Sequence, residues 1–231
     1  MPKGFSYTEK IKRNKIFALI IFIVIVLIIL YQLISSFIFK TYRLQTNMMY
    51  PTFEKGEILG ATPIFHAENL QRGDIVFRKA LYKSDLNIFE KTVDAVCALF
   101  TAKLFQPFSR DRTALTSGTV LRVIGLPGDT IYLDNFVAYI KNTQNENFLT
   151  EFELSDIDYN ISTTQVPNNW ERSLPFSAAT KTFVLGKNEF FLLSDNRIAS
   201  FDSRLSGTCS AANISEKIIC VTWPFKAWKK F

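Results

Sequence analysis

The feature that most constrains this chain is an uncharged run of 24 residues, from Ile16 to Phe39. Its first part, Ile16 to Leu30, contains only apolar residues. A helix of this length extends about 36 Å, which is enough to cross the hydrocarbon core of a bilayer. A soluble helix normally keeps a polar face, and a cleaved leader has a shorter apolar part followed by a small-residue cleavage site. The sequence therefore predicts an uncleaved transmembrane helix over residues 16–39, in contact with membrane lipid.

Charge is distributed unequally around this run. Residues 1–15 contain five Lys or Arg and one Glu, whereas only Lys40 and Arg43 closely follow the run. The positive-inside rule therefore predicts a cytoplasmic tail over residues 1–15 and export of residues 40–231 from a single-pass anchor in the cell membrane. Five of the chain's six net positive charges lie within residues 1–40. The exported part is nearly neutral, so we expect no nucleic-acid partner.

Residues 40–231 show the pattern of a β-rich domain. Short apolar or alternating runs are bounded by Gly, Pro, Asn and Asp, which is typical of strands joined by turns. Asp134-Asn135 between two such runs predicts a two-residue hairpin turn, because both residue types tolerate a positive φ. We expect a mainly β domain on a single N-terminal transmembrane helix. The expected strands cover residues 57–61, 74–77, 119–124, 129–133, 136–140, 183–185, 189–193 and 217–221.

Two segments interrupt the β pattern. Residues 86–105 carry apolar side chains at helical spacing, which predicts an amphipathic helix within a helical insertion at residues 78–118. Such a helix either packs on the β domain or lies on the membrane surface. Residues 142–180 are rich in Asn, Thr, Ser and acidic residues. This composition indicates an irregular excursion with little core of its own.

The cysteines and the single histidine limit other chemistry. Cys209 and Cys220 would be able to form a disulfide in an exported domain, although the odd count of three cysteines leaves this open. His66 is the only histidine, and no Cys-x-x-Cys spacing is present. We therefore expect no metal site and no cofactor.

Four segments, in order, resemble one enzyme family. Residues 46–53, Thr-Asn-Met-Met-Tyr-Pro-Thr-Phe, resemble the nucleophile segment Ser-x-Ser-Met-x-Pro-Thr-Leu of type I signal peptidases. Residues 72–77 resemble the family's Arg-Gly-Asp-Ile-Val-Val-Phe strand, and residues 122–129 its Arg-x-x-Gly-Leu-Pro-Gly-Asp segment. Residues 194–204 resemble Gly-Asp-Asn-Arg-x-x-Ser-x-Asp-Ser-Arg, with Ser194 in place of the glycine. With the anchor, the resemblance covers most of residues 16–224.

The resemblance implies an all-β peptidase domain beside the membrane that removes signal peptides from exported preproteins. In this family a serine attacks the scissile carbonyl and a neutral lysine accepts its proton. Here the serine position holds Met48 and the lysine position holds Leu121. A thioether and an alkane exchange no proton at neutral pH. Because losing one member of such a unit costs about 10⁴- to 10⁶-fold in rate, we expect a catalytically silent protein.

Other positions match the family. Thr46 and the main chain of Met48 correspond to the oxyanion site, which holds the developing negative charge. Ser200 corresponds to a serine that touches the family's lysine. The charged residues of the matching segments are interpreted as a structural framework, because removing one partner of a buried ion pair is costly. The framework positions are Pro51, Arg122, Asp195, Asn196, Arg197, Ser200, Asp202 and Arg204.

Three functions remain in competition. The first is a silent family member that binds extended preprotein segments or an active signal peptidase. A Met48–Leu121 pair favours it, because two apolar side chains would fill the space of the dyad without a buried amine. The second is an active endopeptidase with relocated groups, for which Thr46 supplies a hydroxyl and Lys103 and Lys141 are the nearest lysines in sequence. The third is a non-enzymatic envelope assembly protein that docks through residues 78–118 and 142–180.

Overall fold

The computed structural model describes residues 7–80, 86–100, 107–108, 118–165, 179–198 and 201–231. The chain divides into two units, Met1–Lys40 and Thr41–Phe231. The first unit contains α1 (Tyr7–Phe37), and its segment Ile11–Tyr31 is long and apolar enough to cross a membrane. The helix begins earlier than the predicted run because the residues before Ile16 include Lys, Arg and Glu, which are good helix formers.

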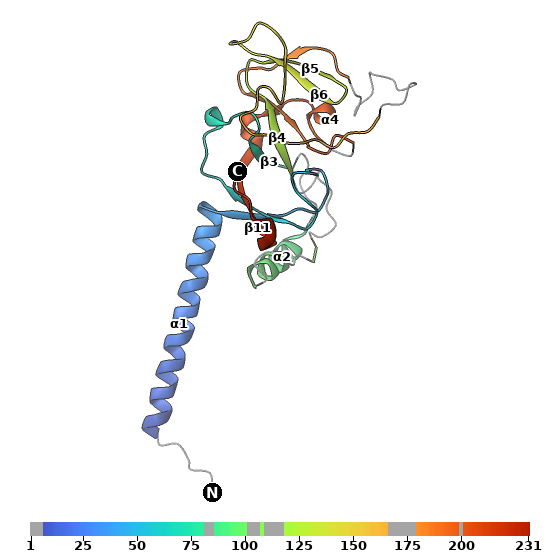
Figure 1. The fold of residues 1–231 in the computed structure, drawn as a ribbon. Helices are drawn as coiled ribbons and strands as arrows, with labels where there is room; N and C mark the ends of the chain where they lie inside the picture. The colour runs from blue at the N-terminus through green and yellow to red at the C-terminus, as the bar shows by residue number, and fades with distance from the viewer. Residues whose placement is uncertain (1–6, 81–85, 101–106, 109–117, 166–178, 199–200) are drawn as a thin grey trace. The chain divides into compact units, whose positions relative to one another are not determined.

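The second unit is built on two antiparallel sheets (Figure 1). The larger sheet has seven strands in the order β1-β2-β11-β3-β4-β9-β10, and the smaller has four in the order β7-β6-β5-β8. The prediction of a mainly β domain is confirmed. The strands of the larger sheet are β1 (Lys40–Arg43), β2 (Ile58–Thr62), β3 (Ile75–Arg78), β4 (Thr119–Gly125), β9 (Glu189–Leu193), β10 (Cys209–Ser210) and β11 (Ile214–Trp223). Those of the smaller sheet are β5 (Thr130–Asp134), β6 (Val137–Lys141), β7 (Leu149–Thr150) and β8 (Phe183–Val184).

Strand β4 is the centre of the hydrophobic core. All seven of its residues are buried, and they contribute to three apolar clusters. Val120 and Leu121 point to opposite faces of the larger sheet and belong to different clusters. Ile124 joins the third cluster, which connects the larger sheet to the smaller one. At Gly125 a Cβ atom would lie 2.2 Å from the Cδ1 atom of Ile131, so this close approach between the sheets requires glycine.

The hairpin between β5 and β6 differs from its prediction by one residue. Asp134 pairs directly with Val137, so the turn consists of Asn135 and Phe136 rather than Asp134-Asn135. Both turn residues have positive φ, 47° and 66°. Asn tolerates this conformation, whereas Phe rarely adopts it. The Phe136 side chain is only 6% exposed, and its burial offsets the backbone cost.

The two interrupting segments contain regular structure. Helix α2 (Ile88–Phe100) confirms the helix expected within residues 86–105, of which residues 101–105 lie outside the described part. Ile88 and Phe89 on α2 are 84% and 73% exposed. In the predicted excursion over residues 142–180, β7 pairs with β6. Strand β8 follows the excursion and pairs with β5. Residues 166–178 of the excursion lie outside the described residues.

No disulfide joins Cys209 and Cys220, because all three cysteines are free thiols. Cys209 lies in β10 and Cys220 in β11, and three strands separate them in the larger sheet. At about 4.8 Å between neighbouring strands, the two strands are roughly 19 Å apart. A disulfide requires Cα atoms within about 7 Å of each other, so the sheet order excludes the pairing.

The remaining helical elements in the described residues are short. They are α4 (Ser203–Ser206), η1 (Ala67–Asn69), η2 (Ala211–Asn213) and η3 (Phe225–Ala227). Helix α4 begins directly after Asp202, whose side chain accepts a hydrogen bond from the main-chain N–H of Arg204. This is the usual capping role of aspartate at a helix start, and it places both predicted framework residues at one end of α4.

Candidate functional site

Met48 lies in the loop between β1 and β2, with its side chain only 8% exposed. Its carbonyl oxygen accepts a hydrogen bond from the main-chain N–H of Asn196 at 2.9 Å. The Asn196 side chain donates a second bond to the carbonyl oxygen of Asn47 at 3.1 Å. Thr46 and Pro51, in the same loop, are exposed. The structure thus joins the predicted nucleophile segment to the predicted Asn196 loop, although the side chain in the predicted attacking position is a thioether.

Leu121 is fully buried in β4. It pairs directly with Val76 of β3, and it belongs to a hydrophobic cluster that includes one thiol. A lysine in such surroundings would have its pKa lowered by desolvation, as a general base requires, but leucine has no proton to exchange. Met48 is not a member of this cluster. The expectation that Met48 and Leu121 together fill the space of the dyad therefore stays a prediction. The cluster consists of Leu70, Val76, Leu121, Val123, Phe190, Leu192, Cys209 and Ile214.

Arg122 and Asp195 form a bidentate ion pair in the core. The Nε–Oδ1 distance is 2.8 Å and the Nη2–Oδ2 distance is 2.6 Å, with side chains 1% and 0% exposed. The Nη1 atom of Arg122 donates to the carbonyl oxygen of Gly73 at 2.8 Å. The Thr52 hydroxyl accepts from Nη2 at 3.0 Å and donates to Asp195. Such complete pairing is what allows two charges to be buried, and it ties the Met48 loop to β4.

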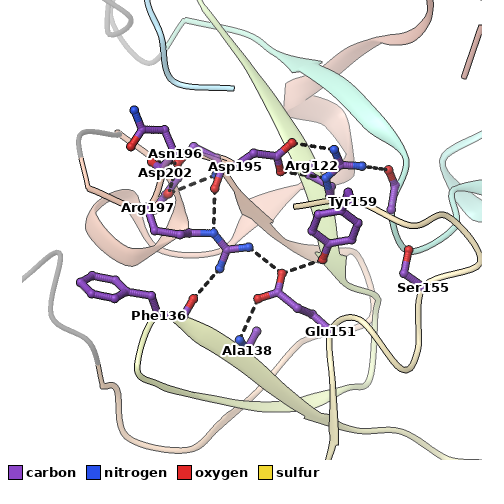
Figure 2. A network of polar contacts seen from close by, with 12 residues as sticks. Arg122, Phe136, Ala138, Glu151, Ser155, Tyr159, Asp195, Asn196, Arg197 and Asp202 are labelled. Atoms are coloured by element: carbon purple, nitrogen blue, oxygen red, sulfur yellow. Dashed lines mark hydrogen bonds and ion pairs between the residues drawn. The ribbon is translucent and has the colours of Figure 1, made fainter. Parts of the chain in front are cut away.

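Arg197 forms a second buried ion pair, with Glu151 (Figure 2). The distance from Arg197 Nη2 to Glu151 Oε2 is 2.5 Å. Arg197 also donates to the carbonyl oxygens of Ser194 and Phe136, each at 2.8 Å. Burial is the largest single influence and would lower the pKa of Arg197, but the charge and hydrogen bond of Glu151, together with Tyr159 and Asp202, raise this pKa overall. The contact to Phe136 connects the predicted framework to the β5–β6 hairpin turn.

Tyr159 connects the two ion pairs. Its hydroxyl donates to Glu151 Oε2 at 2.7 Å, and the Arg122 guanidinium lies over its ring at 4.0 Å. Figure 2 shows Glu151 between Arg197 and Tyr159, at the centre of the network. Burial, followed by the charge of Glu151, raises the pKa of Tyr159 far above its ordinary value. The hydroxyl is therefore a fixed donor, and Arg122, Tyr159, Glu151 and Arg197 form one connected polar network.

Asp202 and Arg204 form the third ion pair of the framework. Arg204 donates from Nε and Nη2 to the two Asp202 carboxylate oxygens at 2.9 and 2.8 Å, and from Nη1 to the carbonyl oxygen of Arg197 at 2.8 Å. The Ser194 hydroxyl, where the family has glycine, lies 2.9 Å from Asp202 Oδ2. Ser194 therefore adds a contact to the framework. Ser200 lies outside the described residues.

Glu151 and Tyr159 were missed by the sequence analysis because both lie in the segment interpreted as irregular. A signal for Glu151 was present. The predicted framework contains three arginines, Arg122, Arg197 and Arg204, but only two carboxylates, Asp195 and Asp202. A buried arginine without a carboxylate is costly, so a third acidic partner was required.

Arg78 is another residue that the sequence analysis missed. It is 3% exposed at the end of β3, and it donates to Ser206 Oγ at 2.6 Å and to the carbonyl oxygen of Phe201 at 3.0 Å. Its Nε atom has no hydrogen-bond partner, and burial lowers its pKa. Arg78 pairs with Thr119, two residues before Leu121, so it lies on the same sheet face as Leu121. A guanidinium is not a general base at neutral pH.

The lysines expected as substitutes are placed differently. Lys141 is exposed on β6 of the smaller sheet, and Lys103 lies outside the described residues. Lys217 binds the carboxylate of Asp74 at 2.7 Å, and Lys79 binds the carbonyl oxygen of Ala212 at 2.8 Å. Neither amine is bonded to a hydroxyl. Within the part of the chain that the structure describes, no group of three or more His, Cys, Asp or Glu residues could hold a metal ion.

Known proteins are similar to this chain in sequence. A model of the family described as signal peptidase, peptidase S26, matches residues 15–223. Signal peptidase IB of Staphylococcus aureus (strain COL) is 26% identical over 220 residues, which is 94% of each chain. Signal peptidase I of Bacillus caldolyticus is 25% identical over 197 residues, which is 82% of each chain.

A solved structure was also found. The crystal structure of a signal peptidase I from Enterococcus faecalis V583 is 17% identical, with a TM-score of 0.31. The match covers 64% of this chain and 96% of that chain.

Proposed function

Because this chain belongs to the type I signal peptidase family, peptidase S26, we propose that it is a catalytically silent member of that family. It would bind extended segments of exported preproteins, or an active signal peptidase, without cleaving them. One observation carries this proposal. Met48 and Leu121 occupy the two positions where the family's reaction needs proton exchange, while the buried ion pairs of the framework are complete.

We also propose that α1 anchors the protein as a single-pass span, with residues 1–15 in the cytoplasm and residues 40–231 exported. The length and apolar composition of Ile11–Tyr31 support the span, and the excess of Lys and Arg before it supports the orientation. Accessibility of single-cysteine variants to an impermeant thiol reagent tests the orientation. Labelling near residue 145, and none near residue 5, is expected in intact cells.

Silence is tested by a cleavage assay on the full chain in detergent micelles, with a preprotein as substrate. We expect no turnover. Turnover that disappears when a residue of this chain is changed contradicts the proposal and favours relocated catalytic groups. Thr46→Ala is the first variant for that comparison, because Thr46 is an exposed hydroxyl in the Met48 loop.

Binding is tested separately by fluorescence anisotropy of a labelled signal-peptide segment. We expect saturable binding to the full chain, and weaker binding of a scrambled peptide of the same composition. A chain that binds neither this peptide nor an active signal peptidase, but co-purifies with another envelope protein at a fixed ratio, favours the assembly function instead.

A further inference from the structure

Arg78 is a buried cation that the framework of ion pairs does not include. Its side chain is 3% exposed. The guanidinium donates to two neutral acceptors, the hydroxyl of Ser206 at 2.6 Å and the carbonyl oxygen of Phe201 at 3.0 Å. The Nε atom has no hydrogen-bond partner. Among the residues that the structure describes, no carboxylate forms an ion pair with Arg78.

The other buried arginines show what such a group normally binds. Arg122, Arg197 and Arg204 are each paired with a carboxylate. The charge of Asp202 also acts on Arg78, but both carboxylate oxygens of Asp202 accept hydrogen bonds from Arg204. A buried charge is costly unless it is paired. Arg78 therefore has an unused donor and an unbalanced charge, which together are suited to an anion.

The strand register places Arg78 beside the predicted lysine position. Strands β3 and β4 are neighbours (Figure 1), and Arg78 pairs with Thr119 while Val76 pairs with Leu121. Arg78 and Leu121 are therefore diagonal neighbours on one face of the sheet, about 7–8 Å apart. Ile214, which pairs with Arg78, belongs to the same apolar cluster as Leu121. A long arginine side chain can span this distance.

The chemistry of the family's reaction suggests which anion meets Arg78. Hydrolysis of the scissile amide adds water across the bond, so the released signal peptide ends in a carboxylate and the mature protein begins with an amine. An intact preprotein presents a neutral amide at the same point. A released peptide that lies in the site with its end beside position 121 brings its carboxylate within reach of Arg78. Guanidinium and carboxylate are planar groups that bind each other through two parallel hydrogen bonds.

We propose that Arg78 binds the C-terminal carboxylate of a cleaved signal peptide, so that this chain prefers the released peptide to the intact preprotein. The proposal rests on the peptide binding proposed above. The guanidinium turns from the Ser206 hydroxyl toward position 121 when the peptide binds. This exchange is favourable because a carboxylate balances the buried charge and a hydroxyl does not.

The experiment compares two peptides that differ at one chemical group. Both are the same signal-peptide segment, labelled at the N-terminus and ending at the cleavage point, and one has a free carboxylate while the other has a C-terminal amide. Fluorescence anisotropy measures their binding to the full chain in micelles of an uncharged detergent at pH 7. We expect the carboxylate peptide to bind about tenfold more tightly. Arg78→Gln should remove this preference, and Arg78→Lys should retain part of it.

A matched control removes one positive charge from the next residue. Lys79 is exposed, and Lys79→Gln should leave the preference unchanged. A preference that survives in Arg78→Gln, or that falls equally in both variants, overturns the proposal. The comparison of the two peptides on the parent chain needs no variant: equal affinities contradict the role of Arg78 alone, whereas binding of neither peptide contradicts peptide binding itself and this proposal with it.

Discussion

The main-chain N–H of Asn196 donates a hydrogen bond to the carbonyl oxygen of Met48 at 2.9 Å. The bond connects the predicted nucleophile position to a loop whose own charges are fully paired. Asp195, next to Asn196, holds Arg122, which follows Leu121 in β4. The two altered positions are therefore each adjacent to an intact part of the framework.

Restoring the dyad should restore turnover. In the variant Met48→Ser with Leu121→Lys, we expect preprotein cleavage at least on the order of 10²-fold above either single variant, because such residues act as a unit. Burial at position 121 would lower the pKa of the new lysine, as its role requires. The same cleavage assay on Met48→Ala with Leu121→Lys is the control. If the double variant melts like the parent chain and still cleaves nothing, the loss of activity extends beyond these two residues.

Replacing Glu151 should destabilise the domain strongly. Glu151→Gln leaves the Arg197 guanidinium buried without its counter-charge, which costs about 3–5 kcal/mol of unfolding free energy. Denaturant unfolding of the chain in detergent measures this. Glu146→Gln is the matched control, because Glu146 is exposed in the same segment and should change stability by less than about 0.5 kcal/mol. Similar midpoints for the two variants would refute the importance of the Arg197–Glu151 pair.

Two threonines in the Met48 loop should differ in their contribution to stability. The Thr52 hydroxyl bonds to both Arg122 and Asp195, so Thr52→Val should cost about 1–2 kcal/mol. Thr46 is exposed, and Thr46→Val should leave the unfolding free energy unchanged. Thermal unfolding of both variants, side by side, provides the comparison. A larger loss of unfolding free energy in Thr46→Val than in Thr52→Val would contradict the role of the Thr52 hydroxyl bonds in stabilising the loop.

Alkaline pH should destabilise the protein through Cys209. Burial raises the pKa of this thiol to about 11 from an ordinary value near 9, although the charge of Arg78 acts in the opposite direction. Because the pKa in the folded state lies above that in the unfolded state, the stabilisation is complete below pH 9 and is lost as pH rises through 11. Between these values the parent chain should lose about 2 kcal/mol more stability than Cys209→Ala. If the unfolding midpoints of the parent chain and of Cys209→Ala fall equally as the pH rises, the result contradicts a raised pKa of a buried Cys209 thiol.

The sequence predicted the apolar helix, the β class and most strands, because these depend on local periodicity and on turn residues. It placed the hairpin turn one residue early, because Phe136 takes a positive φ that local preference disfavours and burial compensates. It allowed a Cys209–Cys220 disulfide that the sheet order excludes. It also missed Glu151, because a single carboxylate in a polar segment carries no local sign of its buried arginine.

The amino-acid sequence by itself determined which side chains occupy the predicted dyad positions. Met48 and Leu121 cannot exchange protons in any fold, since that property belongs to the residue type. Only the tertiary structure decided which charges balance one another: the pairing of Arg197 with Glu151 and of Arg122 with Asp195. Ion pairs between distant segments follow from where the chain brings them in space, and no periodicity along the sequence records that distance.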